Sequence, residues 1–175
     1  MGGRLSVVLR RRMAVTLFLG YSSGLPLLAT TTALQAWMKD LNIDLSRIGL
    51  IALVGLPYTL KFLWAPVMDR FVPPFLGRRR GWMLLTQLAL MASLAALALA
   101  DPAQSPWLTA LCAVLVCFSS ASQDIVLDAH RRDTLPDEEL GLGSSLFVTG
   151  YRLGMLTSGA GALWLDEAWS AVFAR

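Results

Sequence analysis

Three charged residues lie inside long apolar stretches of this sequence, and they are its strongest candidates for chemistry. Lys61, Asp124 and Arg152 are each embedded among mostly uncharged residues. A charge deep in a membrane helix is costly, so it usually faces a partner or a water-filled cavity. The three residues therefore predict either a pathway for a substrate or a proton, or a structural network of ion pairs that holds helices in register.

Polar neighbours extend this charged set. Asp128 follows Asp124 by four residues, on the same helical face and nearer the membrane edge. The lysine stem is long enough to bring Lys61 to Asp124 if their two helices are neighbours. Three further candidates for ligand contacts are predicted at plausible depths, although each could equally bond a neighbouring helix. These are Gln35, Gln123 and Tyr151.

Other kinds of site lack the residues they need. Cys112 and Cys117 would point about 140° apart on a helix, which favours two buried thiols over a disulfide or a metal pair. His130 is the single histidine and lies beside Arg131 and Arg132. No phosphate-binding glycine loop appears, and no basic face with interleaved aromatics. We therefore expect no metal, no cofactor and no nucleic-acid partner.

Five apolar segments must position these residues. The chain is 55% hydrophobic and 15% charged, whereas a soluble domain carries charge at about a quarter of its positions. About 20 apolar residues cross a bilayer, and lone helices satisfy their own backbone in lipid. The sequence thus predicts an all-α membrane protein embedded in a lipid bilayer, with spans at about 13–38, 48–68, 81–100, 106–127 and 143–165.

The arginines predict the orientation of these spans. One side of the membrane would receive Arg4, Arg10, Arg11, Arg12, Arg70, Arg78, Arg79, Arg80, Arg131 and Arg132, and the other only Lys39, Arg47 and Arg175. An excess of positive charge marks the cytoplasmic side. Residues 1–12 are therefore predicted to be cytoplasmic, 13–165 to form helices 1–5, and 166–175 to form a periplasmic tail ending before a sixth helix.

Small residues and prolines predict how the helices pack. Ridges of small residues let membrane helices approach closely, and prolines interrupt the backbone hydrogen bonds. The proline kinks could serve rocking motions, or only reflect the frequency of proline in membrane helices. The small residues are Gly20, Gly24, Gly150, Gly154, Ser158 and Ala162, and the prolines are Pro26 and Pro57.

The loop after the second span suggests a gate. Ion pairs at a helix end can lock or release neighbouring helices, although the arginines could also only enforce topology. The candidate latch residues are Asp69, Arg70, Arg78, Arg79, Arg80 and Asp128. The order Asp-Arg…Gly-Arg-Arg resembles the signature loop of the major facilitator superfamily. Here Ala65 replaces its first glycine, and residues 72–76 are extra.

A closer resemblance runs in order from about residue 17 to 164. Gly24-Leu25-Pro26, Lys61-Phe62-Leu63-Trp64, Gln123-Asp124-Ile125 and Gly150-Tyr151-Arg152 resemble the anhydromuropeptide permease family of major facilitator transporters, which is related to the acetyl-CoA transporters. The resemblance implies proton-driven uptake (symport) of N-acetylglucosaminyl-anhydromuramyl peptides across the bacterial inner membrane. It also implies a role in peptidoglycan recycling, upstream of β-lactamase induction and antibiotic resistance. Members have two halves, so this sequence matches an N-terminal piece that needs the missing C-terminal half.

Three alternatives stay open beside this function. The chain could serve a major facilitator transporter of another substrate, or act as a non-transporting scaffold or partner subunit. An aspartyl protease is disfavoured, because Asp124 and Asp128 share one helix and cannot face each other across a cleft. We expect no enzyme activity. The sequence from Gly150 to Gly159 lacks the proline of antiporters, which favours uptake.

Overall fold

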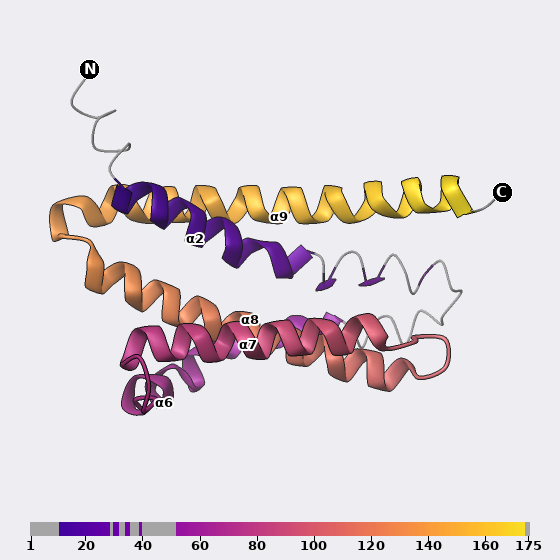
Figure 1. The fold of residues 1–175 in the computed structure, drawn as a ribbon, viewed down its shortest axis with the longest axis horizontal. Coiled ribbons are helices and arrows are strands. Elements are labelled where there is room, and N and C mark those ends of the chain that lie inside the picture. The colour runs from indigo at the N-terminus through magenta and orange to yellow at the C-terminus, as the bar shows by residue number, and fades with distance from the viewer. Residues whose placement is uncertain (1–10, 29, 32–33, 36–38, 40–51, 174–175) are drawn as a thin grey trace, which may run out of the picture. The chain divides into compact units, whose positions relative to one another are not determined.

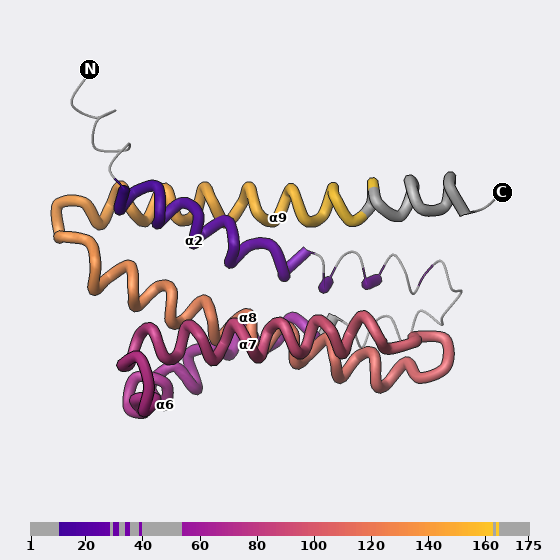
Figure 2. Tube along the Cα trace, in the orientation of Figure 1, coloured from indigo at the N-terminus to yellow at the C-terminus, as the bar shows by residue number. Residues whose placement is uncertain are grey.

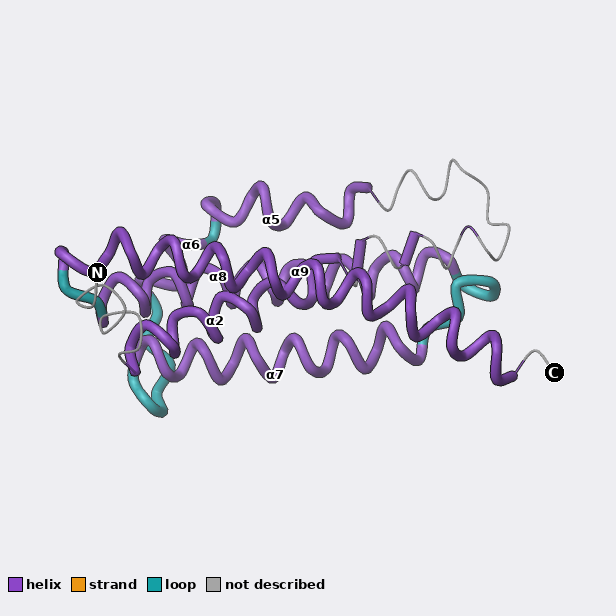
Figure 3. The backbone as a smooth tube through the Cα atoms, turned by 90° about the horizontal axis from the view of Figure 1, so that it is seen from above, coloured by secondary structure: helices purple, strands orange, loops and turns teal. Residues whose placement is uncertain are grey.

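The computed structural model describes residues 11–28, 30–31, 34–35, 39 and 52–173. Their regular elements are all helical (Figure 3), which confirms the all-α fold class. The α-helices are α2 (Arg11–Leu28), α5 (Leu56–Leu60), α6 (Ala65–Arg70), α7 (Arg78–Leu99), α8 (Pro106–Thr134) and α9 (Asp137–Phe173), and the 3-10 helices are η2 (Ala52–Gly55) and η3 (Lys61–Leu63). Most of the predicted segment 1–12 and the start of the second span lie outside the described residues.

The helices form two compact units. The first contains α2 as far as Leu25, the end of α8 from Leu127, and α9. The second runs from Pro26 to Val126 and contains α5, α6, α7 and most of α8. Within the second unit the path in Figure 2 reverses after α7, so α7 and the first part of α8 run in opposite directions.

Glycines set the packing of the first unit, where α2 and α9 run side by side (Figure 1). A Cβ atom on Gly20 or Gly24 would lie less than 3.0 Å from the backbone of α9. A Cβ atom on Gly150 or Gly154 would lie equally close to the backbone of α2. The predicted close approach is therefore confirmed at these four glycines, where the two backbones touch directly.

The second predicted span is a broken helix rather than a continuous one. The expected interruption lies at Gly55, where η2 ends, and Pro57 stands in the first turn of α5. A second interruption, which was not predicted, is the 3-10 turn Lys61–Leu63. It ends three residues before Pro66, which lies in the first turn of α6. A proline ring lacks an amide hydrogen and clashes with the carbonyl four residues earlier, so the preceding turn tightens.

The last two predicted spans are shorter than the helices that contain them. α8 continues past residue 127 to Thr134 and stops before Leu135-Pro136, because the residue before a proline disfavours the helical conformation. α9 extends beyond 143–165 at both ends. In the described part of the chain, α7 and α8 are long and apolar enough to cross a membrane by length and composition.

The second unit has a small apolar core around α8. Leu34, Val54, Ala113 and Cys117 are buried together there. Both Cys112 and Cys117 are buried free thiols. This confirms the prediction that the cysteines act as small apolar residues.

Candidate functional site

A buried polar segment interrupts the apolar sequence of α8. Ser120, Ser122, Gln123 and Asp124 are each at most 8% exposed. Buried polar groups are stable in such surroundings only when other groups satisfy them. The segment therefore needs partners from the helices that cover it, and the broken helix of the second unit supplies several.

Lys61 and Asp124 form an ion pair across two elements. The Lys61 Nζ lies 3.9 Å from the Asp124 Oδ2. The Asp124 side chain is 8% exposed, whereas that of Lys61 is 36% exposed. This separation exceeds a hydrogen-bond length, so the attraction is Coulombic. The structure thus brings together the two predicted residues, and the 3-10 turn of η3 is the element that presents the lysine.

Two hydrogen bonds hold the same elements against α8. The Tyr58 hydroxyl donates to Ser120 Oγ at 2.8 Å. The Trp64 Nε1 donates to Ser122 Oγ at 3.1 Å, and the Trp64 ring packs on Phe118 with centroids 4.8 Å apart. Sequence reasoning missed these contacts, although the serines next to Gln123 and Asp124 were a signal. They tie α5 and Trp64 to α8 on either side of Lys61.

Gln123 is the exception among the buried polar groups. Its Oε1 atom is buried and accepts no hydrogen bond from the described residues. Burying an unpaired amide oxygen costs about 1–3 kcal/mol, so this atom is available to a donor from outside the unit. Gln35, the other predicted amide in this unit, is half-buried.

A predicted latch contact joins the end of α6 to the start of α7 across the loop between them. Arg79 Nη1 lies 2.8 Å from Asp69 Oδ1. The Trp82 Nε1 donates to the Phe71 carbonyl at 2.8 Å, and Gly77 has a φ of 76°, which glycine adopts without strain. These contacts fix the geometry of the loop around one arginine. The side chains of the other predicted arginines, Arg70, Arg78 and Arg80, are exposed.

The remaining predicted residues lie in the first unit. The Asp128 carboxylate pairs with Arg131 at 3.1 Å on the same helix, and its part in the latch stays a prediction. The side chain of Arg152, which was expected to face a partner or a water-filled cavity, is exposed and forms no ion pair with the described residues. Tyr151 is half-buried on α9, where its carbonyl contacts Gly24.

The sequence now identifies the class of protein. Residues 13–174 match the model of the Major Facilitator Superfamily. The chain belongs to this superfamily of transporters, and it is therefore a multi-pass membrane protein.

Individual relatives narrow the comparison. The chain is 55% identical over 159 residues to the anhydromuropeptide permease of Escherichia coli K12, a match that covers 90% of this chain and 32% of the permease. It is 45% identical over 170 residues to an uncharacterized protein of Haemophilus influenzae, covering 96% of this chain and 40% of that protein. The chain thus spans about a third to two fifths of the length of these curated relatives.

Proposed function

We propose that this chain forms the N-terminal part of a proton-driven importer of N-acetylglucosaminyl-anhydromuramyl peptides. The observation that carries the proposal is the ion pair between the buried Asp124 and Lys61. It lies in a chain of transporter ancestry that is 55% identical to an anhydromuropeptide permease. A carboxylate beside a partly exposed lysine can change partners when it takes a proton, and such an exchange couples proton movement to a conformational change.

The polar groups suit a large anionic sugar-peptide. Lys61 in the second unit supplies positive charge for the carboxylates of the peptide, and Arg152 in the first unit is a separate candidate for that role. The Gln123 Oε1 atom, which is buried and unpaired among the described residues, suits an N–H or hydroxyl donor of the sugar. Gln35 and Tyr151 are further candidates for contacts with the substrate. We assign proton binding to Asp124, because its side chain is the most buried of the three charged candidates.

The latch contact suits a gate at the cytoplasmic surface. In the proposed orientation residues 1–12 and the loop with Asp69 and Arg79 face the cytoplasm of a bacterial inner membrane. The 2.8 Å contact between Asp69 and Arg79 would then close one conformation and open in the other. Arg70, Arg78, Arg80 and Asp128 contribute charge at the same surface.

A complete transport path needs more than these elements. In this superfamily the path lies between two related halves. We therefore propose that transport also requires a segment that corresponds to the unmatched part of these relatives. Asp124 and Asp128 lie on one helix, so we expect no protease activity.

A chimera tests the proposal. Residues of this chain would replace the matching segment of the Escherichia coli permease in a strain that lacks the permease. We expect the chimera to restore uptake of labelled anhydromuropeptide, and the chain alone to restore none. A chimera that is present in the membrane but imports nothing would contradict the proposed substrate. Uptake by the chain alone would contradict the need for a second half.

A further inference from the structure

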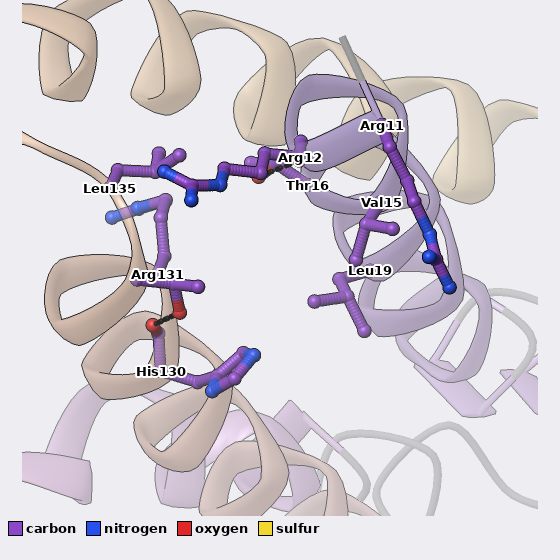
Figure 4. A pocket seen from close by; sticks show the side chains of 9 residues that line it. Arg11, Arg12, Val15, Thr16, Leu19, His130, Arg131 and Leu135 are labelled. Carbon is purple, nitrogen blue, oxygen red and sulfur yellow. Dashed lines mark hydrogen bonds between the residues drawn. The ribbon is translucent and has the colours of Figure 1, made fainter.

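A cavity of about 180 Å³ lies in the first unit, between the first two turns of α2 and the end of α8. Part of its wall is apolar, from Val15 and Leu135, and basic side chains surround the rest. In Figure 4 Arg12 reaches from α2 toward Leu135, and the His130 ring is turned toward α2. The other basic residues are Arg11 and Arg131. The cavity therefore combines an apolar wall with a cationic rim.

The ion pairs near this cavity are made by the arginines of α8. Arg131 pairs with Asp128 at 3.1 Å and lies 4.7 Å above the Phe147 ring. Arg132 lies outside the cavity and pairs with Asp137 at 3.7 Å. Within the described ranges, neither Arg11 nor Arg12 has an ion-pair partner. In Figure 4 the Arg12 side chain extends toward Leu135 at the cavity, whereas the Arg11 side chain points away from it, so an anion that enters the cavity would meet the Arg12 guanidinium group.

We propose that this cavity binds the headgroup phosphate of an anionic phospholipid, with an acyl chain lying against Val15. The arginine distribution puts this end of the helices at the cytoplasmic surface, where anionic lipids concentrate and where basic pockets between helices bind acidic headgroups. Guanidinium groups match phosphate oxygens in a two-point geometry. A free phosphate shares those contacts but gains nothing from the apolar wall, so the lipid is the better ligand.

The test measures lipid binding by the chain as its host makes it, tagged at its own locus and purified in mild detergent. Native mass spectrometry would compare added phosphatidylglycerol with phosphatidylcholine of the same acyl chains, with inorganic phosphate as a competitor. We expect the anionic lipid to bind preferentially, and Arg12→Gln to weaken it roughly tenfold, as for the loss of a charge-assisted hydrogen bond. The matched control is Arg132→Gln, which removes the same charge outside the cavity and should change binding little.

A second variant probes the apolar wall without changing the charge. Val15→Trp adds bulk at a side chain that is 44% exposed, so folding should tolerate it. We expect it to weaken lipid binding and leave the headgroup preference intact. Equal binding of the two lipids, or an equal loss in Arg132→Gln, would overturn the proposal. Displacement of the lipid by millimolar inorganic phosphate would also overturn it and identify a simple anion site.

Discussion

At the scale of single residues, the question is whether Asp124 couples transport or only holds two helices together. Its carboxylate is buried, but Lys61 is about a third exposed and remains partly hydrated. Removing Lys61 would leave the buried Asp124 charge with less compensation, which costs more stability than losing a surface pair. A structural role would therefore appear as loss of folded protein, and a coupling role as loss of transport at a normal protein level.

The residue-scale prediction compares the two acids of α8. In the chimera, Asp124→Asn should abolish concentrative uptake while the protein stays in the membrane at normal level. Asp128→Asn, whose partner is the neighbouring Arg131, should give a milder defect. Uptake and membrane protein level must be measured together. Normal accumulation in Asp124→Asn would contradict the coupling role. Loss of protein that returns when Lys61 is also neutralised would instead support the structural ion pair.

At the scale of elements, the sequence predicted that helices approach closely at the glycines, but not which helices would meet. The small-residue ridges correctly indicated a close approach, because glycine spacing fixes how closely two backbones can come together, and the structure shows that the partners are α2 and α9. The contact of Lys61 with Asp124 could be predicted only on the condition that their two helices are neighbours, which the sequence did not establish. The 3-10 turn at Lys61 was missed, since it results from Pro66 acting one turn upstream.

The element-scale prediction uses two glycines of different surroundings. Gly20→Ala would force a methyl group into the backbone at Phe147 and should destabilise the protein by about 1–3 kcal/mol. Gly141→Ala is the matched control, because nothing lies within 4 Å of its Cβ position and alanine favours helix by up to about 1 kcal/mol. Thermal unfolding in detergent measures both. An unchanged midpoint in Gly20→Ala would show that α2 and α9 do not pack this closely in the membrane.

At the scale of the whole molecule, the predicted orientation in the membrane depends on the distribution of charge among all the loops and not on any single helix. The arginines gather in segments that alternate with weakly charged ones along the chain. Such an asymmetry is set during insertion, when positive loops remain on the cytoplasmic side. The proposed latch and the proposed lipid site are both assigned to the cytoplasmic side, and both assignments therefore depend on this uneven distribution of arginines.

Reporter fusions test this orientation. Fusions at Arg12, Gly77 and Pro136 should report a cytoplasmic position, and fusions at Asn42, Gln104 and Glu167 a position outside. A phosphatase reporter active only outside, paired with a fluorescent reporter active only inside, distinguishes the two. An outside signal at Gly77 would contradict the five-span arrangement.

The 3-10 turn between Pro57 and Pro66 also limits which changes of length this protein can tolerate. Each residue added to a helix rotates everything after it by about 100°. An insertion or deletion between Tyr58 and Trp64 would therefore turn one of these anchors away from its serine on α8, and Lys61 away from Asp124. The loop 71–77 is free of that restriction except at Phe71, Pro73 and Phe75, which contact α7. Natural variation in length should consequently collect in that loop and avoid the turn that carries the lysine.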